Sequence, residues 1–467
     1  MSSPSVNSPT LTQLDVLVLA AGLGTRMKSN LAKVLHKLDG RPLIAHVCRT
    51  AAELSAKKIV VVVGHQASEV QKAVETELGK VSAGFAHQSQ QRGTGDAVAA
   101  ARDALSEAGS IVLILSGDVP LVKTETLRNL IETHQRENSS CTILTIRMEN
   151  PTGYGRIVRD EAGNFVGIKE QRDANEDERQ IREVNSGIYC FDRAKLFAAL
   201  QQVRPSNSQG EYYLTDVPAI LKSEGNYIGL YQHNDAREVS GVNTRAELSE
   251  FEALLRRRTI RRLMIEAGVT FLDPSHTYVS SDAKIGRDCV IHPDVHIEGN
   301  SEIGEACEIQ QGSRLVDSRL GDRVTVKDHC LIVDSEIGDD CAVGPFAHLR
   351  MNARMEAGSV VGNFVEVKKS TLGRGTKSMH LTYLGDATIG EKTNIGAGTI
   401  TCNYDGKEKH QTIIEDNVKI GSDTMLIAPV RVGSGSVTGA GSVVTEDVPP
   451  NTLVTGVPAK VRKKLTE

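Results

Sequence analysis

The sequence has no long apolar run, no paired-cysteine motif and no excess of positive charge. No apolar segment approaches the roughly 20 residues that a membrane helix needs, which argues against a helical membrane protein. The formal net charge of −5 argues against a dedicated nucleic-acid binder. The eight cysteines show no CxxC spacing, so we expect buried thiols in a reducing cytosol rather than disulfides or a zinc site.

Length and composition indicate more than one domain. At 467 residues the chain is too long for a single core. Residues 1–13 are rich in Ser, Pro and Thr and lack the basic start and apolar stretch of a signal peptide, so they predict a disordered tail on a cytoplasmic protein. We expect one domain over 14–246 and another over 269–467. Residues 247–268 would link them, with a helix over Glu247–Ala267 ended by Gly268 and an arginine run on its solvated face.

An aliphatic residue returns at every sixth position over much of the C-terminal part. Neither a helix nor an amphipathic strand has this period, whereas a short strand plus a turn, stacked coil upon coil into a parallel β-helix, does. We expect the aliphatic residue to point inward and the Gly or Asn beside it to make the corner with a positive φ. The repeating positions are Ile285, Ile291, Ile297, Ile303 and Ile309; Ile337, Val343, Leu349, Met355, Val361 and Val367; and Ile414, Ile420, Leu426, Val432, Thr438 and Val444.

The N-terminal part instead alternates strands with helices. Val16–Ala20, Ile59–Val63 and Ile111–Leu115 are short, nearly all-apolar runs that suit parallel strands buried on both faces. Helical stretches such as Leu43–Leu54 and Ala67–Leu78 lie between them. The pattern predicts an open α/β sheet that binds its ligand beyond the C-terminal ends of the strands.

A glycine-rich loop follows the first of these strands, over Leu19–Met27. Its glycines would let backbone N–H groups approach phosphate oxygens, and Arg26 and the nearby Lys33 add positive charge. The loop is neither a Walker A motif nor a dinucleotide fingerprint. A tight turn is the simpler interpretation of the glycines, but together with Lys33 they favour a nucleoside triphosphate site.

Asp118 directly follows the strand Ile111–Leu115, in the segment Ser116–Pro120. A carboxylate at the C-terminal end of a parallel strand faces the ligand and is well placed to hold Mg²⁺ against phosphates. Taken alone, an aspartate in a turn is an equally good interpretation.

The six-residue rhythm breaks at Lys377–Asp386 and again at Thr399–Lys407. Loops that leave a rigid solenoid commonly carry its function. A rod used only for oligomerisation would explain the coils before about residue 330, but not the polar cluster around these breaks. That cluster comprises Arg350, Lys368, His380, Tyr383, Asn394 and Asn403.

Further segments make a family resemblance specific. The loop Leu19–Met27, Lys33 and Gly117-Asp118 resemble the sugar-nucleotidyltransferase superfamily. Joined to a hexapeptide β-helix, they resemble the bifunctional N-acetylglucosamine-1-phosphate uridyltransferase / glucosamine-1-phosphate acetyltransferase family, over the whole chain except the tail. The narrowing segments are Gln88 with Gln91–Gly95, Pro151–Ile157, Glu183–Tyr189 and Gly241–Asn243.

The resemblance implies a fold and a pair of reactions. The fold would be an α/β Rossmann-like nucleotidyltransferase domain followed by a left-handed parallel β-helix of hexapeptide repeats. The enzyme would acetylate glucosamine 1-phosphate with acetyl-CoA, then transfer UMP from UTP to N-acetylglucosamine 1-phosphate with release of pyrophosphate. It would use Mg²⁺, form a homotrimer, and need no nucleic-acid or membrane partner in supplying UDP-N-acetylglucosamine for peptidoglycan and lipopolysaccharide.

The resemblance also implies roles for individual residues in the first reaction. Asp118 and Asn243 would bind the metal, and Asn243 would also contact the N-acetylglucosamine moiety with Gly155, Glu170 and Asn185. The nucleotide would be held by Leu19, Ala20, Ala21, Gly22, Arg26, Lys33, Gln88, Gly93 and Thr94.

For the second reaction, the resemblance makes His380 the general base, with Glu366 as a partner that orients it. Arg350 and Lys368 would grip the sugar phosphate. Sugar and acetyl-CoA contacts would come from Tyr383, Asn394, Ala397, Asn403, Tyr404, Ser422 and Ala440.

Two positions depart from the family pattern. Ala32 stands where a Pro usually precedes the lysine. Gly456 stands where some members have an arginine before Val-Pro, which leaves Lys460 or Arg462 to meet the coenzyme A phosphates.

Two other functions remain open from the sequence. One is a pyrophosphorylase for a different sugar or base, such as ADP-glucose or GDP-mannose, with a non-catalytic β-helix for assembly. The segments His380–Tyr383 and Asn394–Gly398 argue against it. The other is a trimeric scaffold without activity, which Asp118 and Asn243 oppose.

Overall fold

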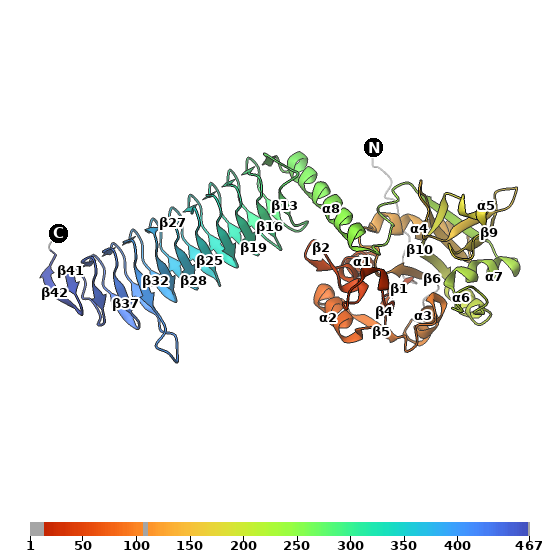
Figure 1. Cartoon of the computed structure of the whole chain (residues 1–467), viewed down its shortest axis with the longest axis horizontal. Coiled ribbons are helices and arrows are strands. Elements are labelled where there is room, and N and C mark those ends of the chain that lie inside the picture. Colours follow the sequence, from red (N-terminus) through yellow and green to blue (C-terminus); the bar gives the residue numbers. More distant parts are fainter. Residues whose placement is uncertain (1–13, 106–110, 466–467) are drawn as a thin grey trace, which may run out of the picture. The chain divides into compact units, whose positions relative to one another are not determined.

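The computed structural model describes residues 14–105 and 111–465, and the chain divides into two compact units between Phe251 and Glu252 (Figure 1). The tail expected over residues 1–13 lies outside the described residues. Within the described part of the chain, no helix is long and apolar enough to cross a membrane.

The N-terminal unit is built on a mixed sheet with the strand order β11-β7-β10-β6-β1-β4-β5. Its strands are β1 (Leu14–Leu19), β4 (Lys58–Val63), β5 (Ala83–His87), β6 (Ile111–Ser116), β7 (Cys141–Arg147), β10 (Glu183–Asp192) and β11 (Ile228–His233). The hairpins β2 (Lys37–Leu38) with β3 (Arg41–Pro42) and β8 (Arg156–Arg159) with β9 (Phe165–Lys169) complete the strands of this unit.

Helices connect these strands. They are α1 (Leu43–Ala52), α2 (Ala67–Leu78), α3 (Thr94–Ala100), α4 (Thr124–Arg136), α5 (Glu176–Arg179), α6 (Arg193–Leu200) and α7 (Val217–Ser223). The three strands expected from sequence are adjacent and parallel, with β1 between β6 and β4. Val16, Val61 and Leu113 are fully buried, which explains why these strands read as continuous apolar runs.

The C-terminal unit is a parallel β-helix whose coils hydrogen-bond to one another along three faces (Figure 1). The first face contains β12 (Thr270–Phe271), β15 (Val290–Ile291), β18 (Glu308–Ile309), β21 (Thr325–Val326), β24 (Ala342–Val343), β27 (Val360–Asn363), β30 (Lys377–His380), β33 (Asn394–Ile395), β36 (Lys419–Ile420), β39 (Val437–Thr438), β41 (Thr452–Gly456) and the antiparallel β42 (Ala459–Lys464).

The second face contains β13 (Tyr278–Val279), β16 (His296–Glu298), β19 (Arg314–Val316), β22 (Leu331–Val333), β25 (His348–Arg350), β28 (Glu366–Lys368), β31 (Tyr383–Gly385), β34 (Ile400–Cys402), β37 (Met425–Ile427) and β40 (Val443–Val444). The third contains β14 (Lys284–Ile285), β17 (Glu302–Ile303), β20 (Arg319–Leu320), β23 (Ser335–Ile337), β26 (Ala353–Met355), β29 (Thr371–Leu372), β32 (Ala387–Ile389), β35 (Thr412–Ile414) and β38 (Val430–Val432).

The six-residue positions behave as expected, since every repeating residue identified from sequence is at most 5 % exposed. The register also explains the breaks between the runs. Val290 pairs with Glu308, 18 residues later, but Glu308 pairs with Thr325, only 17 later. A 17-residue coil shortens one segment to five residues and so shifts the phase of the pattern.

The expected role of the glycines beside the inward residues is wrong. Gly304 and Gly421 are not among the positive-φ residues. Instead, a Cβ on either would lie 2.5 Å from a carbonyl oxygen of the next coil, Gly321 or Thr438 respectively. These glycines are needed for close backbone approach. The left-handed corners fall elsewhere, at residues such as Asp294, Asp317, Asp340, Asn417, Gly299 and Gly312.

The cysteines are free thiols, as expected, and all but the partly exposed Cys402 are buried. Cys289 and Cys307 occupy stacked positions, and Cys289 Sγ accepts a hydrogen bond from Cys307 N at 3.4 Å. They act as small core residues.

The helix expected at Glu247–Ala267 is α8 (Arg245–Glu266), followed by Gly268 at φ +68°. Thr244 and Glu247 form a reciprocal capping box at its start. The arginine run is largely solvated, as expected, with Arg257, Arg261 and Arg262 exposed and Arg256 partly buried. The Arg256 guanidinium lies 4.4 Å from the centre of the Tyr278 ring, and Arg262 donates to Ser281 O at 3.2 Å.

The glycine packing leads to a stability prediction. Gly304→Ala should destabilise the β-helix by about 3 kcal/mol, because the added methyl forces two coils apart. Gly441→Ala should be milder, since a Cβ there meets nothing within 4 Å and only its φ of +70° is unfavourable. Denaturant unfolding of the full chain checks this, and equal losses in the two variants would contradict it.

Candidate active sites

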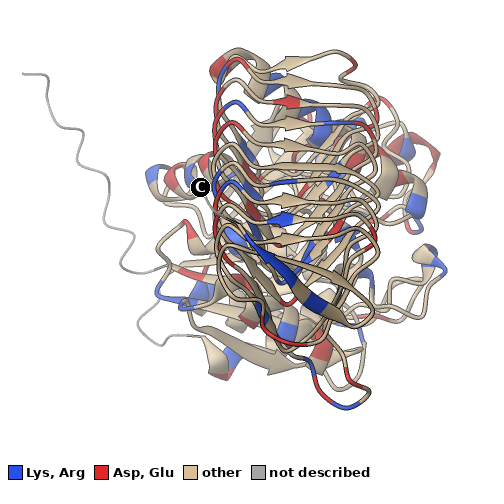
Figure 2. Cartoon of the chain, turned by 90° about the vertical axis from the view of Figure 1, so that its left-hand side faces the viewer, with Lys and Arg blue, Asp and Glu red and all other residues tan. Residues whose placement is uncertain are grey.

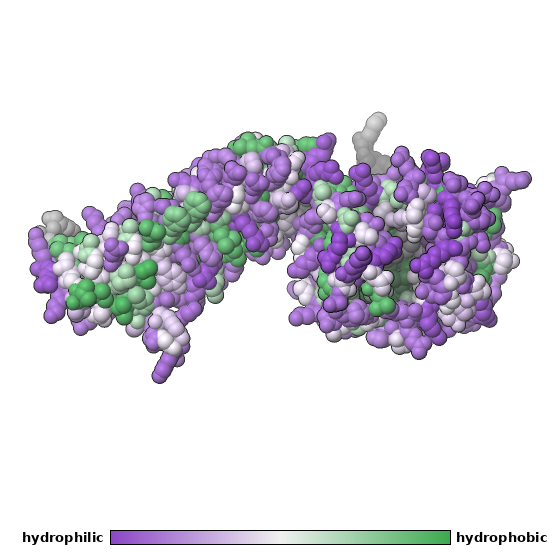
Figure 3. Space-filling model, viewed as in Figure 1, coloured by the Kyte–Doolittle hydropathy of each residue, from purple (hydrophilic) through white to green (hydrophobic). Residues whose placement is uncertain are grey.

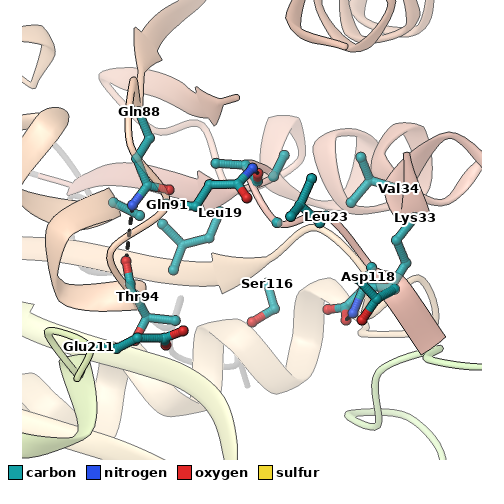
Figure 4. A pocket seen from close by; sticks show the side chains of 17 residues that line it. Leu19, Leu23, Lys33, Val34, Gln88, Gln91, Thr94, Ser116, Asp118 and Glu211 are labelled. Carbon is teal, nitrogen blue, oxygen red and sulfur yellow. Dashed lines mark hydrogen bonds and ion pairs between the residues drawn. The ribbon is translucent and has the colours of Figure 1, made fainter. Parts of the chain in front are cut away.

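A cavity of about 480 Å³ opens beyond the C-terminal ends of β1 and β6 (Figure 4). Of the nine residues expected to hold the nucleotide, all except Arg26 line it. Asp118 lines it too. Most of the expected residues therefore line one cavity, and the structure brings them together at the predicted edge of the sheet.

The glycines of this cavity are required by its geometry. Gly24 has φ +62°, and the position of a Cβ on it is already occupied by the Lys33 side chain. Gly93 has φ +112°, and a Cβ there would lie 2.5 Å from Tyr212 O. The loop thus passes directly against Lys33, which leaves its main chain open to the cavity.

Lys33 stands between the two expected metal ligands. Its Nζ forms an ion pair with Asp118 and lies 3.1 Å from Asn243 Oδ1. Arg26 Nη2 lies 2.8 Å from that same oxygen, which explains why Arg26 is absent from the cavity wall. Asp118 and Asn243, which are 125 positions apart in the sequence, therefore both contact the ammonium group of Lys33.

Backbone contacts hold these two ligands in place. Val242 N donates to Asp118 O at 2.9 Å, and Asn243 N donates to Glu247 Oε2 at 2.6 Å. Glu247 belongs to the capping box of α8, so the start of that helix fixes Asn243. Sequence patterns alone did not predict this link.

The donor set fits Mg²⁺. A carboxylate and an amide oxygen already surround an ammonium group, which stands in for a cation. Among residues 14–105 and 111–465 no group of three His, Cys, Asp or Glu side chains could hold a metal by itself. Water and phosphate oxygens would have to complete the coordination.

Three of the expected sugar residues meet in a second cluster. Asn185 N donates to Gly155 O at 2.9 Å, and Asn185 Nδ2 donates to Tyr189 Oη at 2.6 Å. A Cβ on Gly155 would lie 3.4 Å from Glu170 Oε1 and 2.8 Å from the Ile168 side chain, so only glycine leaves this space open. The fourth, Asn243, lies with Asp118 instead.

Burial raises the pKa of Glu170 above its usual range. A hydrogen bond from Thr215 Oγ1 at 3.2 Å opposes this rise, while the carboxylates of Asp173 and Asp216 reinforce it. A carboxyl group in such surroundings gains from a polar ligand that can hydrogen-bond to it.

Some cavity residues were assigned no role from sequence, although Gln91 and Ser116 lie within the segments that marked the site. Gln91 Nε2 donates to Ala21 O at 2.6 Å and so connects the glycine-rich loop to the segment Gln88–Gly95, which also lines the cavity. Ser116 lies at the end of β6, where its position just before Gly117-Asp118 could have revealed it. Glu211 also lines the cavity, but it comes from an irregular segment with no pattern to mark it.

In the C-terminal unit the pairing of successive coils brings together the residues expected for the second reaction. On the second face His348, Glu366 and Tyr383 are paired in consecutive coils, and so are Arg350, Lys368 and Gly385. The cationic residues Arg350 and Lys368 therefore lie side by side although they are 18 residues apart.

An acidic residue organises the basic side of this cluster. Asp386 Oδ2 lies 3.4 Å from Lys368 Nζ and accepts a hydrogen bond from Asn403 Nδ2 at 2.6 Å. Although burial acts in the opposite direction, these contacts lower the pKa of Asp386. Lys368 has a side chain only 6 % exposed, so the pair is largely shielded from solvent.

Lys409 joins this cluster from the loop that replaces a plain coil after β34. Lys368 beside it lowers the pKa of Lys409, because the two ammonium groups repel each other. The segment Thr399–Lys407 marked the loop in the sequence, but Lys409 itself was missed. Two crowded lysines and Arg350 favour an anionic ligand.

His380 lies at the end of β30, and its partner differs from the one expected. Its Nδ1 is 2.6 Å from Asn363 Oδ1. Glu366, the expected partner, is 2.7 Å from Arg350 Nε and Nη2 instead. The expectation is wrong because Arg350, on the same face, directs two guanidinium nitrogens at Oε1 of Glu366 and so holds that carboxylate.

Three of the five residues expected to contact acetyl-CoA, namely Ala397, Ser422 and Ala440, lie in one column, and Asn403 and Tyr404 do not. Lys377, Asn394, Lys419 and Val437 are paired in successive coils. Three residues after each of them come His380, Ala397, Ser422 and Ala440 respectively. These therefore share one edge of the β-helix, with Asn363 as the preceding member.

Asn394 belongs to the same face as His380. Tyr404 lies in the loop that projects from the coils in Figure 1, where it forms a backbone bridge with Lys409. It is 60 % exposed, and its hydroxyl donates to Gly406 O at 2.8 Å. Asn403 lies at the base of this loop and is 7 % exposed.

The C-terminal hairpin closes the end of the column. Leu453 pairs with Val437, which puts Gly456 in line with Ala440. Arg462, on the antiparallel β42, lies with Nη2 3.6 Å from the Cβ position of Gly456, and its Nε donates to Thr455 Oγ1 at 3.3 Å. Figure 2 shows the basic residues gathered on this last strand.

Comparison with family models agrees with this division. A MobA-like NTP transferase domain matches residues 16–208, a GMPPB C-terminal domain matches 274–380, and six bacterial transferase hexapeptide repeats match 411–446. The expected fold class, an α/β Rossmann-like nucleotidyltransferase domain followed by a left-handed parallel β-helix, is confirmed.

Curated relatives match almost the whole chain. "Bifunctional protein GlmU" of Syntrophomonas wolfei is 47 % identical over 441 residues, covering 94 % of this chain and 97 % of that protein. The protein of the same name from Heliobacterium modesticaldum is 49 % identical over 437 residues, covering 94 % of each. That from Geobacter metallireducens is 46 % identical over 467 residues. A solved UDP-glucose pyrophosphorylase complexed with UDP-glucose aligns with 52 % of this chain and 98 % of its own at 16 % identity and a TM-score of 0.44.

Proposed function

The chain belongs to the family of bifunctional GlmU proteins, and from this premise we propose that it makes UDP-N-acetylglucosamine in two reactions. It acetylates glucosamine 1-phosphate with acetyl-CoA and then transfers UMP from UTP to the product, releasing pyrophosphate. The observation that carries the proposal is that each unit gathers its own cluster of reactive side chains from segments far apart in the sequence.

We propose that residues 14–246 carry out uridylyl transfer. The glycine-rich loop and Gly93 bring backbone N–H groups to the nucleotide, while Lys33 and Arg26 neutralise its phosphates. Gly155, Glu170 and Asn185 hold the N-acetylglucosamine, whose hydroxyls satisfy the buried carboxyl of Glu170. In-line attack by a sugar phosphate requires alignment and charge neutralisation rather than a protein nucleophile.

Mg²⁺ would be held by Asp118 and Asn243 at the place that Lys33 Nζ reaches. When bound, it would supply a positive charge that stabilises the five-coordinate phosphorus of the transition state. Lys33, whose Nζ contacts the same two oxygens, would then be available to neutralise the phosphates.

We propose that residues 269–467 carry out acetyl transfer. Arg350, Lys368 and Lys409 bind the sugar 1-phosphate, which relieves the repulsion between the two lysines. Tyr383, Asn394 and Asn403 hold the sugar. His380 takes the proton of the glucosamine amine as that amine attacks the thioester carbonyl, and the coenzyme A thiolate leaves.

The column Ala397, Ser422 and Ala440 would receive the pantetheine arm of acetyl-CoA, with its thioester beside His380. From the His380 coil to the Gly456 coil is four coil steps, about 19 Å at ~4.8 Å per step. This span suits an extended pantetheine arm and puts the coenzyme A phosphates near Arg462. Some family members have an arginine at the position of Gly456, and here Arg462 would take over its role.

We also propose that the protein forms a homotrimer through its β-helix. A stack of exposed apolar side chains runs along one corner of consecutive coils. Its members are Phe346, Phe364 and Leu381, which are 49, 56 and 62 % exposed, and the two rings lie 5.4 Å apart. Figure 3 shows further apolar surface along this unit. A neighbouring copy would bury this corner beside His380. We place the enzyme in the cytoplasm, the compartment of its substrates.

The two reactions should be separable by single substitutions. Asp118→Asn should reduce uridylyl transfer by roughly a hundred- to thousand-fold, because the metal loses its only charged protein ligand. His380→Ala should reduce the kcat of acetyl transfer by about 10²–10⁴-fold. Each variant should keep the other reaction and so serves as the matched control. Separate assays of pyrophosphate release and acetyl-CoA consumption check this, and loss of both reactions in either variant would contradict it.

Arg462 should recognise the phosphates of coenzyme A. Arg462→Met should raise the KM for acetyl-CoA by about ten- to hundred-fold, the loss expected for a charged hydrogen bond. Its KM for glucosamine 1-phosphate should not change. Lys460→Met, on the same strand, is the control and should have little effect. A larger effect for Lys460 would reverse the assignment.

The apolar corner should decide the oligomeric state. Phe346→Glu should shift the protein from trimer to monomer in sedimentation velocity, because three charges would be buried in each assembly. Uridylyl transfer should persist. Tyr227→Glu, at an equally exposed aromatic of the N-terminal unit, is the control. A Phe346→Glu variant that remains trimeric would place the interface elsewhere.

A further inference from the structure

Asn363 contacts His380 through its side chain and the next residue, Leu381, through its main chain. Its Oδ1 lies 2.6 Å from His380 Nδ1, and its carbonyl oxygen accepts a hydrogen bond from Leu381 N at 3.0 Å. The Thr382 hydroxyl donates to His380 O at 2.6 Å. The strand pairing explains this arrangement, because Asn363 is the residue of β27 directly opposite His380 on β30.

We propose that Asn363 is the positioning residue of the acetyltransferase base. This inference rests on the proposed role of His380. With Asn363 Oδ1 as acceptor, the imidazole carries its proton on Nδ1, and the lone pair of Nε2 is directed away from the coil below. Nε2 is then the atom that takes the amine proton.

A neutral partner has a different effect from a carboxylate. A carboxylate next to His380 would favour the imidazolium form, which cannot accept a proton, whereas an amide orients the ring without adding charge. The nearby carboxylate, Glu366, is occupied by Arg350 at 2.7 Å. The site thus separates two tasks, with Asn363 orienting the base and Glu366 holding the phosphate-binding arginine.

The surroundings of His380 contain few groups that could mask this effect. The neighbouring strands on the same face, β27 and β33, carry no titratable residue, and β30 itself carries Lys377. On the next face, around the corner at Leu381, lie Glu366, Lys368 and Tyr383. Glu366 and Lys368 are in ion pairs with Arg350 and Asp386.

The test measures the pH dependence of acetyl transfer in the full-length enzyme. In Asn363→Asp, the new carboxylate should raise the pKa of His380, so the acidic limb of the kcat profile should move up by about one pH unit. In Asn363→Ala, kcat should fall by between ten- and a hundred-fold, as expected for a misoriented base, with the KM for acetyl-CoA unchanged. Asn352→Asp adds the same charge at another corner and should leave the profile in place.

The outcomes separate this inference from the proposed function. If His380→Ala is inactive in acetyl transfer but Asn363→Asp leaves the acidic limb where it was, Asn363 does not position the base. Wild-type kcat in Asn363→Ala would overturn the inference in the same way. If His380→Ala keeps full activity, the role of His380 itself is wrong. An unchanged KM for acetyl-CoA in every variant shows that the β-helix is folded, and uridylyl transfer at the wild-type rate shows the same for the N-terminal unit.

Discussion

The hydrogen bonding between successive coils is the constraint on which the C-terminal site depends. Each coil lies about 4.8 Å from the next, and its strands pair in a fixed register. Residues 17, 18 or 25 positions apart therefore become neighbours, as Asn363, His380, Ala397, Ser422 and Ala440 do. A shift of the strand register by one residue would exchange the inward and outward side chains. The inward aliphatic residues prevent this shift and so also determine which polar side chains point outward.

The N-terminal site depends on a different principle. There the strands β1 and β6 end at one edge of a sheet, and the loops that follow them supply the chemistry. Asn243 reaches Asp118 only because the capped start of α8 holds it. The first site is thus assembled by convergence of loops, and the second by repetition along a solenoid.

Much of both sites could be predicted from the sequence because period and strand-end position are local signals. The inward residues and the three central strands follow from such signals. Eight of the nine residues expected at the nucleotide site line the cavity, but most of them were expected from the family resemblance. What failed depends on contacts between distant segments. Gly304 serves close coil packing rather than a corner, and Glu366 is taken by Arg350. Lys409 and Glu211 lie in irregular segments, where no period marks a position.

The stacked column has a consequence for the size of the ligand. Because His380 and Gly456, beside which Arg462 lies, are four coils apart, their separation is set in steps of about 4.8 Å. One coil more or fewer between them would misplace the basic end of the hairpin by a full step while leaving the fold intact. The loop after Cys402, in contrast, can change in length without altering this distance, since it leaves the coil and returns to the same register. Under the proposed function, the number of coils would set the length of acyl carrier that can reach from His380 to Arg462, whereas a change in the loop would affect only the proposed sugar pocket.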